Sequence, residues 1–389
     1  MPFALYFLAL AVFVMGTSEF MLAGLLPAIA TDLNVDVATA GLLTSAFAIS
    51  MTFGAPLMAA LSRRLPERTT LLSCLLLFAI SHATAALAPD YVLLLITRIL
   101  GAVSNAGFLA VALNTATRLA PAHLKGRALA ILLAGTSSAT IAGVPAGTLL
   151  GAHVGWRSVF WVIGSLCLPA IVAVFMAVPV SRAQGAPADR APQLITELAE
   201  LFTPRLAGTM LLAALVNGGT FAVFTFITPL VTTTAGLAEP WVPLVLVLFG
   251  LGSFAGITVA GRVSDRRPVA VLATGGPLLL AGWIALALLA ERPAALLALV
   301  FAQGFLSFAL GSTLIGQVIH AATGAPTMGG SYATMALNAG AALGPVLGGI
   351  TLSAGFGLLA PVWVAALLVA LAMLISLVAP QLLGPRPRR

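Results

Sequence analysis

The sequence predicts an all-α membrane protein whose twelve transmembrane helices form two six-helix halves. Of its 389 residues, 60% are hydrophobic and 7% are charged, whereas soluble globular proteins carry ~25% charged residues. Twelve apolar runs are long enough to cross a bilayer of ~30 Å as helices. The second half of the chain repeats features of the first half in the same order. These observations exclude a soluble globular protein.

The twelve apolar runs are separated by short segments that carry the charged and turn-forming residues. We expect them at residues 3–29, 40–61, 69–87, 92–117, 128–151, 158–179, 206–230, 241–260, 269–290, 294–317, 328–352 and 360–383. A polar, Pro-containing segment divides them six and six. We therefore predict an N-terminal bundle at 1–179, a cytoplasmic linker at 180–205 and a C-terminal bundle at 206–389. Apolar residues at helical spacing in 194–202 predict a short amphipathic helix on the membrane surface.

The basic residues predict the orientation of the spans. If the N-terminus lies in the cytoplasm, fifteen of the 18 Lys and Arg residues fall on the cytoplasmic side, and only Arg157 and Arg292 fall outside. This distribution follows the positive-inside rule. It places both termini in the cytoplasm and predicts a multi-pass membrane protein. The net charge of +7 therefore reflects orientation and does not indicate a nucleic-acid partner.

The internal repeat predicts how the protein moves. The matching features lie about 200 residues apart and pair Gly16-Thr17 with Gly219-Thr220, Pro27 with Pro229, Ser62-Arg63-Arg64 with Asp265-Arg266-Arg267, Gly101 with Gly304, and Pro145 with Pro345. Two halves with the same orientation are the parallel repeat of transporters that rock one half against the other.

Glu19 is the only acidic residue within a predicted span. A charged acid near the middle of a transmembrane helix costs ~2.5–3.5 kcal/mol on insertion scales. Such a carboxyl group pairs with a cation or takes up a proton. We interpret Glu19 as the proton-carrying group of a transporter. The alternative is a structural carboxyl group whose partners lie on neighbouring helices.

Arg98 is the only basic residue within a predicted span, at a depth comparable to that of Glu19. Because arginine does not lose its proton in proteins, it is a fixed charge that favours ionisation of a nearby acid. The alternative is that Arg98 extends to the membrane interface. In the repeat, Glu19 and Arg98 correspond to Ala222 and Phe301. This asymmetry suggests ion coupling in the first half and apolar substrate contacts in the second.

Two runs carry small residues at four-residue spacing beside a proline. These are Gly135, Ala139, Gly143, Gly147 and Gly151 with Pro145, and Ala336, Gly340, Gly344 and Gly348 with Pro345. Small residues let helices approach closely, and proline permits a bend. The stripes indicate either a bendable seam between the halves or close packing alone.

Candidate substrate contacts are aromatic and amide side chains at membrane depth: Asn105, Asn217, Phe221, Phe224, Tyr332 and Asn338. A mostly apolar pocket with a few polar groups suits a small, neutral, amphiphilic ligand. For each residue, interhelical bonding or packing is the alternative. His82, Cys74 and Cys167 show no metal-ligand spacing and are interpreted as structural. No phosphate-binding loop motif is present, so we expect the proton gradient to drive transport without a cofactor.

Three segments carry a resemblance to a known family: Gly261-x3-Asp265-Arg266, Leu94-x3-Arg98 and Gly143-Val144-Pro145-Ala146-Gly147. On these segments the sequence resembles the twelve-span drug:proton antiporters of the major facilitator superfamily, and its similarity to bacterial members implies a place in the bacterial inner membrane. The resemblance implies a role in proton transfer for Arg98, and export over uptake. The stretch from Gly16 to Pro27 is most similar to bacterial chloramphenicol-resistance exporters, which implies drug and proton recognition by Glu19. The chain departs from the family pattern at Met58, Ser62 and Gly101.

We therefore expect a proton-coupled exporter, not an enzyme, that works as a monomer on a hydrophobic antibiotic such as chloramphenicol. An exporter of a sugar or nucleoside is the nearest alternative, because related branches share the Gly-Thr-x-Glu-Phe stretch. A membrane-embedded enzyme would usually show a catalytic cluster within the spans, and the sequence has none. A channel would not need a two-half repeat with one titratable acid.

Overall fold

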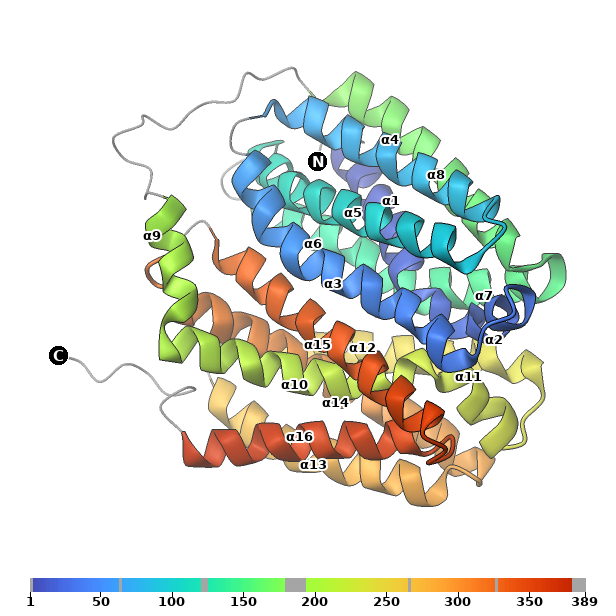
Figure 1. The fold of residues 1–389 in the computed structure, drawn as a ribbon. Coiled ribbons are helices and arrows are strands. Elements are labelled where there is room, and N and C mark those ends of the chain that lie inside the picture. Colours follow the sequence, from blue (N-terminus) through green and yellow to red (C-terminus); the bar gives the residue numbers. More distant parts are fainter. Residues whose placement is uncertain are drawn as a thin grey trace.

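The computed structural model describes residues 3–62, 65–119, 125–178, 194–264, 267–325 and 328–379, and all regular secondary structure in these ranges is helical (Figure 1). The first half comprises α1 (Phe3–Phe20), α2 (Leu22–Asp32), α3 (Val37–Ser62), α4 (Glu67–Ala86), α5 (Tyr91–Leu119), α6 (Lys125–Ser138), the π-helix η2 (Ala139–Gly143), α7 (Val144–Val154) and α8 (Trp156–Ala177). The sequence-based fold class is confirmed.

The linker helix α9 (Leu194–Ala199) and the turn η3 (Glu200–Phe202) lead into the second half. This half comprises α10 (Pro204–Thr225), α11 (Ile227–Pro229), η4 (Leu230–Thr234), η5 (Glu239–Trp241), α12 (Val242–Val263), α13 (Pro268–Leu289), α14 (Pro293–Ala321), α15 (Gly329–Ser353) and α16 (Ala360–Val378). Proline occupies the first turn of α10, α12, α13, α14 and α16, where its missing N–H removes no helical bond.

Ten helices in the described ranges are long and apolar enough to span a membrane, and the bent pair α1–α2 makes an eleventh span. The remaining predicted run, 128–151, is divided among α6, η2 and α7, which have 14, 5 and 11 residues. Each piece is shorter than a span, and together they cover the expected length. The first run, expected to be one helix, bends by 51° between Phe20 and Leu22.

Each half has its own hydrophobic core. Phe78, Phe108 and Phe160 belong to the core of the first half, and Trp283 belongs to that of the second. In Figure 1 the helices from α1 to α8 lie above those from α10 to α16, and α9 lies at one end. Phe226 of the second half packs into the hydrophobic core of the first half, so the two halves share an apolar contact. The boundaries of the two predicted bundles stay a prediction.

The halves meet along α3 and α15, which run side by side, and where η2 and α7 pack on α12 (Figure 1). They also touch where α2 meets α11. Pro27 has no N–H to bond the carbonyl group of Ala23, four residues earlier. The hydroxyl group of Thr228 donates to that carbonyl oxygen from the other half, at 2.6 Å. The carbonyl group of Ala23, left without its helical donor by Pro27, therefore takes part in a hydrogen bond between the halves.

The glycines of the two stripes face helices of their own half, which favours close packing; the bendable seam between the halves stays a prediction. Gly143 faces Thr17 of α1, and Gly344 faces the backbone of Gly218 in α10. Neither glycine has room for a Cβ atom. Between the halves, Gly250 of α12 admits a close approach to the backbone of Thr140.

The linker helix differs from the expected surface helix. Glu197, a charged residue of this helix, is buried. The backbone oxygen of Glu197 accepts a hydrogen bond from the hydroxyl group of Tyr332 at 2.8 Å. Since α15 begins at Gly329, this bond attaches the linker to the first turn of α15.

Gly344→Ala is expected to destabilise the protein by about 1–3 kcal/mol, because its methyl group would overlap the backbone of α10. The matched control is Gly311→Ala in α14, where nothing lies within 4 Å of the added carbon and alanine favours the helix. Thermal unfolding in detergent compares the two. Equal melting temperatures would contradict tight packing of α15 on α10.

Candidate substrate and proton site

The bend in the first span places three consecutive residues, Ser18, Glu19 and Phe20, in the last turn of α1. Ser18 is fully buried and points into the first half. Phe20 packs on the second half, with its ring centroid 5.9 Å from that of Phe221. Glu19, between them, is partly buried. The acid therefore lies at the junction of the two halves.

Arg98 of α5 lies inside the first half and does not extend to the membrane interface, since its side chain is 1% exposed. Its Nη1 donates to Ser18 Oγ at 2.9 Å, and its guanidinium group lies 4.4 Å from the ring centroid of Phe47, a cation–π geometry. Within the described residues, Nε and Nη2 have no hydrogen-bond partner. One edge of the guanidinium group is held and the other is free.

Ser18 also contacts His82 of α4, with 2.6 Å between Oγ and Nε2. His82 Nδ1 lies 2.8 Å from the carbonyl oxygen of Phe78, which only accepts, so Nδ1 carries the proton. In the neutral ring Nε2 is then an acceptor. The Ser18 hydroxyl group therefore donates to His82 and accepts from Arg98. The result is a continuous chain from Arg98 through Ser18 and His82 to the backbone of α4.

Glu19 receives one hydrogen bond, from Asn105 Nδ2 to Oε2 at 3.4 Å. This distance is at the long end for an N–H···O bond. The charge of Arg98 acts on Glu19 electrostatically, although the two side chains form no ion pair within 4.0 Å in the described structure. Glu19 therefore lies within reach of Asn105 and of the charge of Arg98; the roles of these residues in proton coupling and substrate binding stay a prediction.

An aromatic cluster extends from Phe20 into the second half. Phe20 lies 6.2 Å from Phe224, and Phe221 lies 6.0 Å from Phe224, both edge to face. Phe224 continues to Phe249 at 4.7 Å. Phe221 and Phe224, predicted from sequence, therefore lie beside the acid at the junction of the halves.

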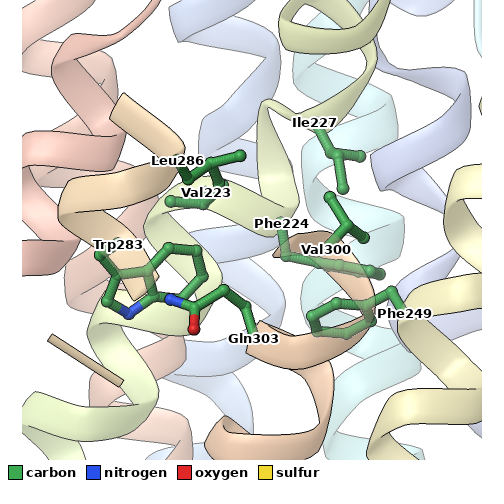
Figure 2. A pocket seen from close by; sticks show the side chains of 8 residues that line it. All are labelled: Val223, Phe224, Ile227, Phe249, Trp283, Leu286, Val300 and Gln303. Atoms are coloured by element: carbon green, nitrogen blue, oxygen red, sulfur yellow. The ribbon is translucent and has the colours of Figure 1, made fainter. Parts of the chain in front are cut away.

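A small cavity lies behind this cluster, between α10, α12, α13 and α14 (Figure 2). Its lining is mostly apolar, with an indole and a carboxamide as the polar groups: Val223, Phe224, Ile227, Phe249, Trp283, Leu286, Val300 and Gln303. The sequence did not single out Trp283. Gln303 was visible as a polar residue within an apolar run.

The sequence profile of the Major Facilitator Superfamily matches residues 8–337. The chain belongs to this superfamily. It is 60% identical over 376 residues to the "Chloramphenicol resistance protein" of Streptomyces lividans, covering 97% of this chain and 96% of that protein. It is 33% identical to the inner membrane transport protein YdhP of Escherichia coli strain K12, covering 90% and 89%. The predicted family is therefore confirmed.

The superfamily fold is also found by structural comparison. A bacterial homologue of the human lysosomal transporter Spinster, in an inward-facing and unoccupied conformation, matches with a TM-score of 0.76 at 18% identity. The match covers 99% of this chain and 98% of that one. At this identity the likeness concerns the fold alone. The chain is a multi-pass membrane transporter of this superfamily.

Three predicted substrate residues form contacts away from Glu19. Asn217 Nδ2 donates to the carbonyl oxygen of Leu337 at 2.7 Å, and Asn338 Nδ2 donates to that of Thr334 in its own helix at 3.0 Å. Tyr332 is buried and donates to the linker. In this conformation the three form interhelical or local bonds. Substrate binding by them stays a prediction.

The predicted conformational motifs are partly described. Gly143, Pro145 and Gly147 lie where η2 meets α7 and are buried. Gly261 lies in the last turn of α12, with open space around its Cα. Asp265 and Arg266 lie outside the described residues. A role for these residues in the conformational change stays a prediction.

Proposed function

We propose that this transporter exports chloramphenicol, or a hydrophobic antibiotic like it, in exchange for protons. The observation that carries the proposal is the 60% identity, over 97% of the chain, to a chloramphenicol resistance protein. An acid and an aromatic cluster at the junction of the halves, with a buried arginine inside the first half, support it. The exporter needs no cofactor beyond the proton gradient and works as a monomer.

In the proposed cycle, Glu19 takes up a proton from outside and releases it to the cytoplasm as drug moves out. One proton entering down ~100 mV supplies ~2.3 kcal/mol, which supports a drug gradient of roughly fifty-fold at ~1.4 kcal/mol per decade. Arg98 favours the ionised form of the carboxyl group by its fixed charge. Drug binding and proton loss are coupled because both use the same junction.

Ser18 and His82 serve the proposed cycle as positioning residues. They hold one edge of the Arg98 guanidinium group, through the bonds of 2.9 Å and 2.6 Å, and leave its Nε and Nη2 free. That free edge is available to the carboxylate of Glu19 when the proton leaves. His82, interpreted as structural from the sequence, thereby gains a role that acts through Arg98.

The decisive experiment is transport by the purified full chain in proteoliposomes with an imposed proton gradient. We expect uphill chloramphenicol movement that a protonophore abolishes, and proton release on drug addition. Cells that express the protein should tolerate more chloramphenicol than cells that express Glu19→Gln. The proposal would be refuted by chloramphenicol transport that the protonophore does not affect. It would also be refuted if cells with the wild type and cells with Glu19→Gln tolerated the same chloramphenicol concentration.

His82→Phe is expected to reduce the transport rate several-fold while leaving the KM for drug unchanged. Phenylalanine keeps the packing on Phe78, whose ring centroid lies 4.1 Å away, but removes the acceptor for Ser18, a bond worth about 1 kcal/mol. His82→Gln, which retains an acceptor, should recover part of the rate. If the substitution changes only the melting temperature, His82 is structural.

A further inference from the structure

Two side chains that line the cavity in the second half carry polar groups without a hydrogen-bond partner among the described residues. Trp283 and Gln303 are 2% and 1% exposed, and Trp283 Nε1 and Gln303 Oε1 have no hydrogen-bond partner among the described residues. Both side chains line the cavity (Figure 2). An unsatisfied buried polar group costs about 1–3 kcal/mol. Two of them beside one cavity make it a candidate site for a polar group of a ligand.

The orientation of Gln303 is fixed. Its Nε2 donates to the carbonyl oxygen of Leu279 at 3.2 Å, so its oxygen is the free end. An indole N–H and a carboxamide oxygen form a donor–acceptor pair. Their complement is a neutral group that both accepts and donates, such as a hydroxyl group or a secondary amide. A carboxylate or phosphate would face the Gln303 oxygen without a proton to share.

The walls of the cavity suit an aromatic or aliphatic body. The rings of Phe224 and Phe249 form one side, 4.7 Å apart, and Phe224 also contacts Phe20, next to Glu19. The cavity measures about 10 Å³, close to the limit for one water molecule. In this conformation it therefore has room for a single polar group and not for a whole drug. The aromatic rings separate it from the junction.

The internal repeat gives the cavity a counterpart. The runs that form α10, α13 and α14 correspond to those that form α1–α2, α4 and α5. In the first half these helices hold Ser18, His82 and Arg98; in the second they border the cavity of Trp283 and Gln303. The corresponding helices of the two halves therefore carry a cluster with a charged residue in the first half and a cluster of neutral residues in the second half.

We propose that Trp283 and Gln303 form a subsite for the hydroxyl or amide group of the exported drug. This inference rests on the proposed function and names the second-half residues that recognise the substrate. The indole N–H donates to the drug's oxygen, and the Gln303 oxygen accepts its O–H or N–H. The ring of the drug displaces Phe224 and Phe249 from their present contact. Chloramphenicol carries hydroxyl groups and a secondary amide beside an aromatic ring, so it is the probe of choice.

The test is drug transport by Trp283→Phe and Gln303→Met in proteoliposomes, with chloramphenicol as substrate. Each variant loses one hydrogen bond, and we expect its KM to rise roughly three- to tenfold, with kcat within about twofold of wild type. Trp363→Phe is the matched control, because Trp363 is 48% exposed on α16; its KM should not change.

An unchanged KM in both variants, with proton-coupled transport intact, would overturn the subsite and leave the proposed function standing. Absence of drug-driven proton release in the wild type would instead refute the proposed function. A lower melting temperature with unchanged KM would assign the cavity to a structural water molecule and overturn the subsite. If Gln303→Met does not fold, Trp283→Phe should remove the chloramphenicol-dependent change in tryptophan emission that wild type and Trp363→Phe show; retention of that change would overturn the subsite.

Discussion

Glu19→Gln is expected to abolish chloramphenicol-induced proton release and to convert the exporter into a passive equilibrator of drug. Glutamine keeps the size of the side chain and a bond to Asn105 but has no proton to exchange. The wild type supports a gradient of up to roughly fifty-fold at ~100 mV, and the variant should support none. Drug distribution across proteoliposomes, with and without a gradient, measures the difference.

The matched control is Glu239→Gln, because Glu239 lies exposed in η5 between the spans. Its transport should equal that of the wild type. Uphill transport and proton release by Glu19→Gln would place the coupling group elsewhere in the chain. Loss of drug binding together with loss of proton release would instead identify Glu19 as a joint site for both ligands, as the sequence-based interpretation holds.

The fold was predictable because membrane-spanning helices can be recognised from the length and the apolar composition of their segments. Each apolar run needs no partner to be recognised, since every backbone bond lies within its own helix. The bends were not predictable from composition. The first span breaks near Met21, and the carbonyl group of Ala23 that Pro27 frees accepts a hydrogen bond from Thr228 of the other half. The composition of the run does not reveal that partner, and it does not reveal the π-helix at Ala139–Gly143.

The sequence revealed those residues of the candidate site that carry a charge within a membrane-spanning segment. Glu19 and Arg98 stand out because charge is costly in hydrocarbon. Other residues of the site do not stand out in the sequence, because their importance depends on which side chains they contact; these are Ser18, His82 and Trp283. Whether a polar group at membrane depth is satisfied is a property of contacts between helices 60 or more positions apart, such as Ser18 with His82, and a single sequence contains no record of them.

Arg98→Met is expected to eliminate proton-coupled transport without loss of stability. The guanidinium group is buried, and its Nε and Nη2 have no hydrogen-bond partner among the described residues. A buried charge whose N–H groups are only partly bonded opposes folding. Replacing it with an apolar side chain should therefore leave the melting temperature unchanged or raise it, while Glu19 loses the charge that favours release of its proton. The substitution then lowers the transport activity while it maintains or raises the stability, which is the trade-off expected of a functional site that destabilises the folded protein.

Arg98→Lys separates charge from geometry. Lysine keeps the positive charge, but one ammonium group does not reproduce the two edges of the guanidinium group, one held by Ser18 and one free. We expect proton release to persist at a rate about tenfold lower, the loss of ~1.4 kcal/mol. Arg118→Lys is the control on the same helix, because its exposed pair with Glu67 contributes about 0–1 kcal/mol. Wild-type coupling in Arg98→Met would show that the acid exchanges its proton unaided, and the chain from His82 to Arg98 would then be packing alone.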